Sequence, residues 1–160
     1  MTKGGMYWAF GIIFLLFVLQ SLGTWIQIKD YQKAMKRIRP KGTVGIGQKK
    51  GFIGHIVLIA CDKEGVITDV EAMEGMTIIA RFRHKESLPW RTLAGTHILE
   101  LLNDFFGMDS KKRRYYRGYI QAAEALEKRF YPDEYEERIA SGRILLEERK
   151  KRKGLFGLGR

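Results

Sequence analysis

The sequence predicts an α+β protein: a single transmembrane helix at the N-terminus, a small antiparallel β-meander domain with a short helix, and a C-terminal helical hairpin. An apolar run without charges comes first, short runs rich in Val, Ile and Thr follow residue 42, and apolar residues recur at helical spacing after residue 105. These patterns divide the chain into a membrane anchor, a basic juxtamembrane helix, a β-rich domain, a helical arm and a flexible tail, at 1–28, 29–41, 42–104, 105–153 and 154–160.

The run from Gly4 to Ile28 has the properties of a membrane-spanning helix. None of its 25 residues is charged, and about 20 apolar residues are enough to cross the hydrocarbon core. Trp8 and Trp25 are separated by about 26 Å on a helix, so that one ring lies near each membrane interface. Two alternatives are a buried core helix and a cleaved signal peptide, which has a shorter apolar core and an A-x-A-like site that we do not find.

Basic residues predict the orientation of this span. Only Lys3 precedes it, whereas six cations follow it within 13 residues: Lys29, Lys33, Lys36, Arg37, Arg39 and Lys41. By the positive-inside rule, the N-terminus lies outside the cell and the main domain lies on the cytoplasmic side of the inner membrane. The basic segment is expected to continue the helix to about Ile38, where Pro40 and Gly42 end it.

Four strands are expected next, at about 43–47, 54–61, 66–72 and 77–83. Gly65 in "DKEG" and Gly75 in "MEGM" supply the turns of an antiparallel meander. Such a sheet needs a cover on its apolar face, and the segment "TLAGTHILELLNDFFG" predicts a short helix for it. Cys61, the single cysteine, lies in the apolar run "HIVLIAC" and is expected to be a small buried residue.

Two further helices are predicted in the last third of the chain. Apolar residues from Tyr119 to Phe130 follow spacings of four, three and four, and the rhythm repeats from Tyr135 to Leu146. Pro132 separates the two segments, and Asp133 is expected to be the N-cap of the second. The stripes indicate a packed seam, either within an antiparallel hairpin or in an oligomerising arm.

The glycine-rich stretch "TVGIGQKKGFIG" resembles a phosphate-binding loop only superficially. Gly45, Gly47 and Gly51 are spaced one residue too far for the dinucleotide fingerprint, and the Lys-Ser or Lys-Thr end of a P-loop is missing. A strand rather than a helix follows, so no helix N-terminus is available to hold an anion. We therefore expect no cofactor, close packing of another segment on Gly45 and Gly47, and two lysines at an exposed turn.

The order and spacing of several short segments resemble the glucitol (sorbitol) operon activator family of bacteria. These segments are "GTVGIG", "VITD", "MEGMTIIAR" and "AGTH", preceded by a tryptophan and a basic stretch in "LGTWIQIKDYQKAMKRI". The resemblance covers about residues 8–102 and implies a positive regulator of genes for sorbitol uptake through a sugar phosphotransferase system. It implies no catalytic or ligand residues, and the chain departs from the shorter members after about residue 105.

Basic residues form two candidate contact groups. The first mixes cations with tyrosines, a composition that suits phosphate contact and base stacking: Lys111, Lys112, Arg113, Arg114 and Arg117. The second would face an anionic membrane surface: Lys33, Lys36, Arg37, Arg39, Lys150, Lys151, Arg152 and Lys153. An ordinary solvated surface explains both groups as well. Nucleic-acid contact remains an open alternative, since neither a helix-turn-helix nor a zinc module is evident.

An enzyme is not expected from this sequence. His55, His84 and His97 are scattered, and no Ser, His and Asp arrangement is evident. His97, at the start of the predicted short helix, is expected to be structural. The acidic cluster is expected to be solvated on the hairpins: Asp62, Glu64, Asp69, Glu71 and Glu74.

Two functions fit these observations. The first is a membrane-anchored positive regulator of a glucitol- or sorbitol-type operon, which acts mainly through protein contacts and has DNA contact as a secondary possibility. The second is a membrane-anchored adaptor or scaffold without a transcriptional role. In both, the expected partners are the lipid bilayer and either another protein or a second copy bound through the C-terminal helices.

Overall fold

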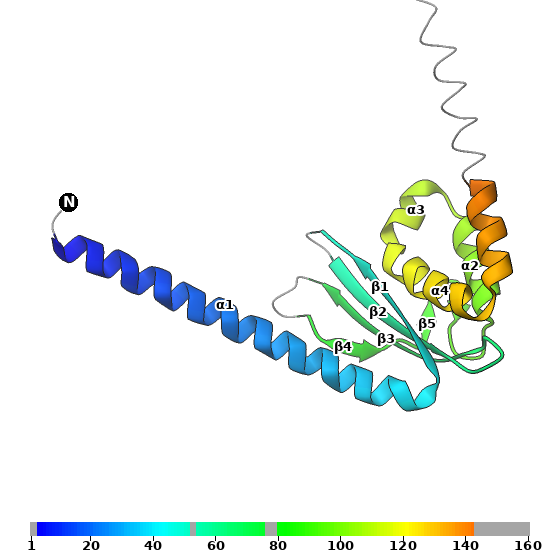
Figure 1. The fold of residues 1–160 in the computed structure, drawn as a ribbon, viewed down its shortest axis with the longest axis horizontal. Helices are drawn as coiled ribbons and strands as arrows, with labels where there is room; N and C mark the ends of the chain where they lie inside the picture. Colours follow the sequence, from blue (N-terminus) through cyan, green and yellow to red (C-terminus); the bar gives the residue numbers. More distant parts are fainter. Residues whose placement is uncertain (1–2, 52–53, 76–79, 143–160) are drawn as a thin grey trace, which may run out of the picture.

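A computed structural model of the chain describes residues 3–51, 54–75 and 80–142. It is an α+β structure in which one long helix, α1 (Lys3–Ile38), projects from a sheet covered by shorter helices (Figure 1). A single 3-10 turn, η1 (Arg39–Lys41), then reverses the chain. The predicted helix end at Ile38 is confirmed. The helix ends there because Pro40 lacks an N–H group and Gly42 has a φ of 150° that other residues rarely adopt.

The main sheet is the predicted antiparallel meander. It contains β1 (Thr43–Lys49), β2 (Gly54–Cys61), β3 (Ile67–Gly75) and β4 (Phe82–His84), paired in sequence order. The third strand extends three residues further than expected. The fourth begins later than predicted, and part of its predicted range lies outside the described residues. The two-residue strands β5 (Ser87–Leu88) and β6 (Arg91–Thr92) were not predicted, because such short strands show no periodicity.

The C-terminal part is helical as predicted, with one additional break. The helices are α2 (Ile98–Gly107), α3 (Ser110–Tyr115), α4 (Arg117–Phe130) and a further helix over 132–142. Asp133 is not the N-cap, because the helix begins at 132 and the Tyr135 N–H donates to the Tyr131 carbonyl at 3.1 Å. Arg138 binds Glu124 and Glu127 of α4, which joins the last two helices as a hairpin. The end of the predicted Tyr135–Leu146 stripe lies outside the described residues.

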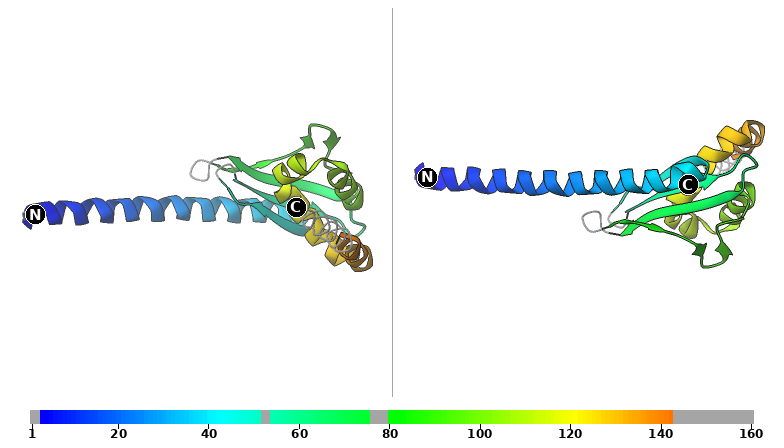
Figure 2. Two further views of the ribbon diagram at one scale, coloured as in Figure 1. Left: turned by 90° about the horizontal axis from the view of Figure 1, so that it is seen from above. Right: turned by 90° about the horizontal axis from the view of Figure 1, so that it is seen from below.

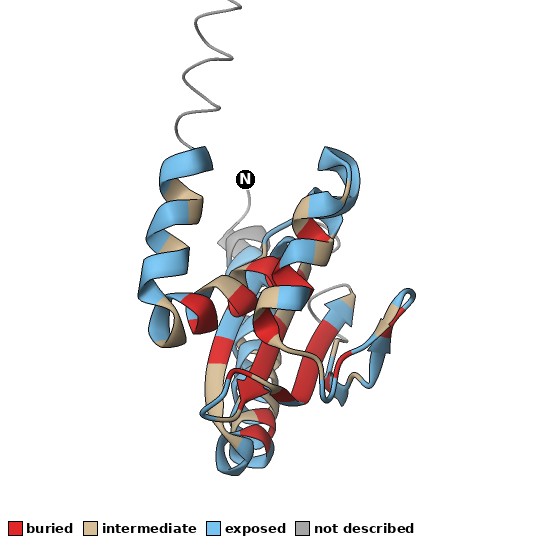
Figure 3. Ribbon diagram, turned by 90° about the vertical axis from the view of Figure 1, so that its right-hand side faces the viewer, coloured by how far each residue is buried: buried red, intermediate tan, exposed pale blue. Residues whose placement is uncertain are grey.

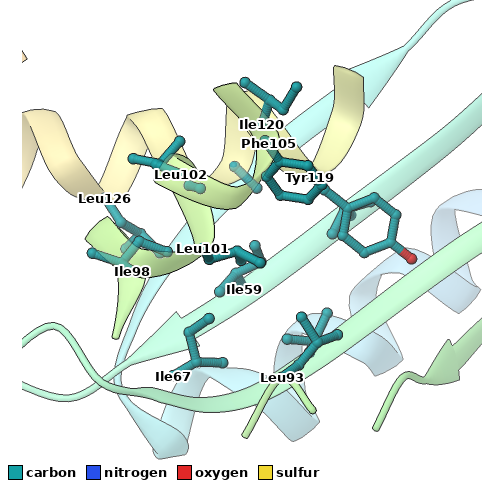
Figure 4. Close-up of a cluster of buried hydrophobic side chains, with 14 of the residues drawn as sticks. Ile59, Ile67, Leu93, Ile98, Leu101, Leu102, Phe105, Tyr119, Ile120 and Leu126 are labelled. Carbon is teal, nitrogen blue, oxygen red and sulfur yellow. The ribbon is translucent and has the colours of Figure 1, made fainter. Parts of the chain in front are cut away.

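Helices pack on both faces of the sheet, as the buried residues in Figure 3 show. The end of α1 covers one face around Ala34, Ile38 and Leu58. Helices α2 and α4 cover the other face with the larger cluster drawn in Figure 4, in which Phe105 and Tyr119 are the largest fully buried side chains. One short helix on the sheet, α2, was predicted, but the packing of α4 on the same face and the role of α1 as a second cover were not.

The glycines of β1 allow α4 to approach the sheet closely. A Cβ atom at Gly47 would lie 1.8 Å from the Gly118 carbonyl oxygen, and one at Gly45 would lie 2.2 Å from the Ala122 carbonyl oxygen. Both contacts are with backbone atoms of α4, which cannot rotate away as the end of a flexible side chain could. The prediction that another segment packs closely on Gly45 and Gly47 is therefore confirmed, and the segment is the backbone of α4.

Helix α1 continues from an exposed apolar half into the domain core. Its side chains between Tyr7 and Ile28 are largely exposed, and it is long and apolar enough to cross a membrane. Its last turns bind the sheet through polar contacts. Asp30 Oδ2 accepts from the Phe82 N–H at 2.7 Å, and Arg37 Nε donates to Glu71 Oε1 at 2.7 Å. No flexible linker separates the apolar half of α1 from the domain (Figure 2).

Two members of the acidic cluster are buried under α1. The exposed fractions of Asp69 and Glu71 are 1% and 3%. Lys41 Nζ binds Asp69 Oδ2 at 2.7 Å, and His84 Nδ1 lies 2.6 Å from Asp69 Oδ1. The expectation that these two carboxylates are solvated is wrong. After the turn at η1 the sheet packs against α1, which buries this part of β3, and no local sequence pattern shows this contact.

Replacement of Arg37 by methionine is expected to destabilise the contact between α1 and the sheet. The buried Glu71 carboxylate would lose its bidentate partner. The expected cost is about 2 kcal/mol, which is less than for a fully buried ion pair because the Arg37 side chain is half-exposed. Urea unfolding of the full chain in detergent, followed by near-UV circular dichroism, measures this loss. Arg39→Met is the control, since Arg39 is exposed; an equal loss in both variants would contradict the role of the ion pair.

Candidate functional site

A basic cleft of about 650 Å³ lies between the end of β1 and the junction of α3 with α4. Its lining contains four cations and two carboxamides: Gln48, Lys49, Lys50, Arg114, Arg117 and Gln121. The Gln48 N–H donates to Gln121 Oε1 at 3.1 Å and so links the strand to α4. Arg114 lies on α3, whose N-cap is Asp109; the Asp109 side chain accepts from the Lys112 N–H at 2.7 Å. The cleft thus combines two segments that are far apart in the sequence.

The cations of this cleft have no acidic partners in the part of the chain that the structure describes. Lys49 Nζ instead lies 5.0 Å from the ring centroid of Tyr115. Elsewhere, cations such as Arg37, Arg91 and Arg138 each bind carboxylates. Unpaired cations in a concave surface create a positive potential that attracts anions. The chemistry of the cleft therefore favours a phosphate or carboxylate ligand.

A buried histidine, His55, lies on β2 opposite Lys49 and contacts the start of α4, beside the cleft. The Gly118 N–H at the start of α4 donates to His55 Nε2 at 3.2 Å, and the His55 ring lies 5.7 Å from the Tyr119 ring. A Cβ atom at Gly118 would lie 2.5 Å from His55 Cδ2, so glycine is required there. Burial, and to a smaller extent the charge of Lys49, lowers the pKa of His55. The imidazole is consequently neutral and accepts from α4 with Nε2.

This arrangement predicts that protonation of His55 destabilises the fold. Because the folded-state pKa lies below the ordinary value of 6.5, the unfolded chain binds more protons. The His55 contribution to the free energy of unfolding is therefore complete above pH 6.5 and decreases as the pH falls toward the folded-state pKa. Urea unfolding between pH 8 and 5 should show a smaller decrease for His55→Gln, which does not titrate. Parallel curves for the two proteins would contradict this role.

An aromatic pocket of about 430 Å³ lies against another side of α3. It is lined by Pro89, Trp90, Met108, Lys112, Tyr115 and Tyr116. The Trp90 and Tyr116 ring centroids are 4.9 Å apart at 82°. Arg91, next to Trp90, binds Glu100 and Asp104 of α2, which fixes the β5–β6 turn above the helices. Exposed, rigid aromatic side chains around an apolar hollow are typical of protein-binding hot spots.

The structure separates the predicted phosphate-contacting residues. Arg114 and Arg117 line the basic cleft, whereas Lys112 lines the aromatic pocket. Lys111 and Arg113 are exposed and line neither cavity. The five cations therefore do not line one common cavity.

The predicted membrane-contacting residues are also distributed over different surroundings. Lys33 lines a shallow cleft with Arg81, and Lys36 and Arg39 are exposed. Arg37 binds Glu71 instead of remaining free. The predicted contacts at Lys150, Lys151, Arg152 and Lys153 lie outside the described residues.

Sequence reasoning missed several residues of these two cavities. Lys49 and Lys50 were assigned to an exposed turn, and nothing in the sequence linked them to Arg114 some 65 residues later. Trp90 lies in a short segment without periodicity. One signal could have indicated the basic cleft: the two adjacent lysines stand beside glycines that were expected to pack against another segment.

Two smaller predictions are confirmed. His97 is structural: its Nδ1 accepts from the Leu99 N–H at the start of α2, and its Nε2 lies 3.0 Å from the Tyr131 hydroxyl. Cys61 is fully buried, and burial raises the pKa of its thiol to about 12. The thiol is therefore inert near neutral pH.

The chain matches a known protein family over most of its length. The family model described as glucitol operon activator protein (GutM) matches residues 8–114. This range includes most of α1, the sheet, α2 and most of α3, and thus most of the residues that line the two cavities. No curated protein and no solved structure matches the chain significantly.

Proposed function

The chain belongs to the glucitol operon activator protein family, and we propose that it is a membrane-anchored positive regulator of a glucitol-type sugar operon. The family match supports the activator role. The exposed apolar half of α1 supports the anchor, and the cations that follow it support a cytoplasmic position of the domain. In this arrangement the N-terminus lies outside the inner membrane.

The regulator acts mainly through protein contacts at the aromatic pocket. The observation that supports this proposal is the exposure of two aromatic residues around one apolar hollow: Trp90 is 38% exposed and Tyr115 is 54% exposed. Lys112 at the rim of the pocket favours a partner segment that combines an apolar anchor with an acidic residue. DNA contact is secondary, because α3, which carries four of the five candidate phosphate-contacting cations, is only six residues long and is too short for a recognition helix in the major groove.

Transcription of the glucitol-type operon tests this proposal. A strain that lacks the gene is complemented with the wild-type chain or with the double variant Trp90→Ala and Tyr115→Ala, and operon mRNA is measured after addition of glucitol. Loss of two hot-spot side chains weakens binding by about 30-fold or more, so mRNA should fall toward the level of the deletion strain. Ile46→Ala, which removes an exposed apolar side chain outside the pocket, should retain full transcription.

Two results would contradict the proposal at different levels. Full transcription with the double variant would exclude the aromatic pocket as the partner site. Equal mRNA in the deletion and wild-type strains would exclude the transcriptional role and leave a membrane-anchored adaptor or scaffold.

A further inference from the structure

The topology turns one end of the domain toward the apolar half of α1. Because η1 reverses the chain, β1 runs back along α1, and β3 runs in the same direction as β1. The contacts of η1 and α1 with β3 follow this antiparallel course: Lys41 binds Asp69, and Arg37 binds Glu71. Asp30 binds the backbone of Phe82, which pairs with Met73 further along β3. The ends of β1 and β3 therefore point toward the apolar half of α1 (Figures 1 and 2).

This end of the domain is basic. On the side next to α1, Lys29, Lys33 and Arg81 line a shallow cleft that also contains Ile26. On the far side of the sheet lies the basic cleft, with two lysines from the end of β1 and two arginines from the α3–α4 junction. The carboxylates nearby are already bonded: Asp30 accepts from the Phe82 N–H, and Glu74 accepts from the Tyr119 hydroxyl and Lys85. Because the seven cations of the two clefts outnumber these two carboxylates, the net charge of this end is positive.

We propose that the basic cleft binds the phosphate headgroups of anionic lipids and so fixes the domain against the membrane surface. The proposal rests on insertion of α1 in the membrane. Without a flexible linker after the span, the domain cannot rotate freely, and the end that carries Lys49 and Lys50 faces the headgroups. Arginine and lysine without acidic partners match the charge of phosphodiesters.

The position of the cleft favours lipid over nucleic acid. Duplex DNA would have to enter between the membrane surface and the end of the domain, where it would be repelled by the same anionic headgroups that attract the cations. Lipid headgroups, in contrast, are already present at this level of α1. Each cation near an anionic surface gains enough free energy for about fivefold preferential contact.

Lysine acetylation of the full chain in lipid nanodiscs tests this proposal. The protein is inserted in discs of phosphatidylcholine alone or with phosphatidylglycerol, treated with acetic anhydride, and digested for mass spectrometry. Acetylation of Lys49 and Lys50 should be about fivefold slower in the anionic discs. Lys63, which is exposed at the opposite end of the sheet between β2 and β3, should react equally in both discs. Arg114→Gln with Arg117→Gln should reduce the protection of the two lysines.

Each further outcome has a defined meaning. Equal acetylation of Lys49 and Lys50 in both discs would overturn the lipid site. Protection by duplex DNA in the phosphatidylcholine discs, without protection by phosphatidylglycerol, would overturn it in favour of nucleic acid. Failure of the chain to enter discs at all would overturn both the lipid site and the proposed anchor, whereas a loss of operon transcription alone affects neither.

Discussion

Replacement of Gly47 by alanine is expected to lower the free energy of unfolding by about 3 kcal/mol or more. The added methyl group would lie 1.8 Å from the Gly118 carbonyl oxygen and 2.5 Å from the Ala122 nitrogen. Both atoms belong to the backbone of α4, so the whole helix would have to move away from β1. This movement would also open the larger core cluster between α4 and the sheet. Such a loss is a large part of the stability of an ordinary domain.

Urea unfolding of the purified chain in detergent, followed by near-UV circular dichroism, measures this effect. Gly107→Ala is the matched control, because a Cβ atom at Gly107 meets no atom within 4 Å. Its stability should stay within about 0.5 kcal/mol of the wild type. Wild-type stability of Gly47→Ala would mean that α4 does not pack on β1 as described.

The double variant Leu15→Arg and Leu16→Arg is expected to remove the chain from the membrane. Each arginine at the centre of a spanning helix costs about 3 kcal/mol, so two cost about 6 kcal/mol. On an exposed helix of a water-soluble protein, the same changes would be nearly neutral, since both leucines are more than half exposed. The variant therefore distinguishes a spanning helix from a solvated one.

Membrane fractionation and operon mRNA are the two measurements for this variant. The chain should shift from the membrane pellet to the soluble or degraded fraction, and operon mRNA should fall with it. Gln32→Arg adds a charge to an exposed position of α1 beyond the span and should change neither quantity. A double variant that stays in the membrane would argue against the assigned span.

The local elements could be predicted from the sequence because each has its own periodic signal. The apolar run of α1, the Val- and Ile-rich strands and the helical stripe from Tyr119 were visible without tertiary information. The close approach at Gly45 and Gly47 could also be expected, because small residues in a strand indicate another backbone nearby. The partner of these glycines, α4, could not be identified from spacing alone.

The candidate site depends on tertiary contacts and was only partly predictable. Arg114 and Arg117 were recognised as basic residues, but their combination with Lys49 and Lys50 requires α4 to lie on β1. In the same way, burial of Asp69 and Glu71 follows from the return of β3 along α1, which no local pattern specifies. Trp90 lies in the turn between β5 and β6, whose two-residue strands are too short to leave a signal.

The central claim, that α1 spans the inner membrane with the domain on its cytoplasmic side, is tested most directly by protease protection of the full chain in sealed vesicles. In right-side-out vesicles the domain should remain intact, and in inverted vesicles protease should remove it and leave a fragment containing the span. The chain should also stay in the pellet after carbonate extraction. Digestion of the domain from the outside, or its release by carbonate, would contradict the account.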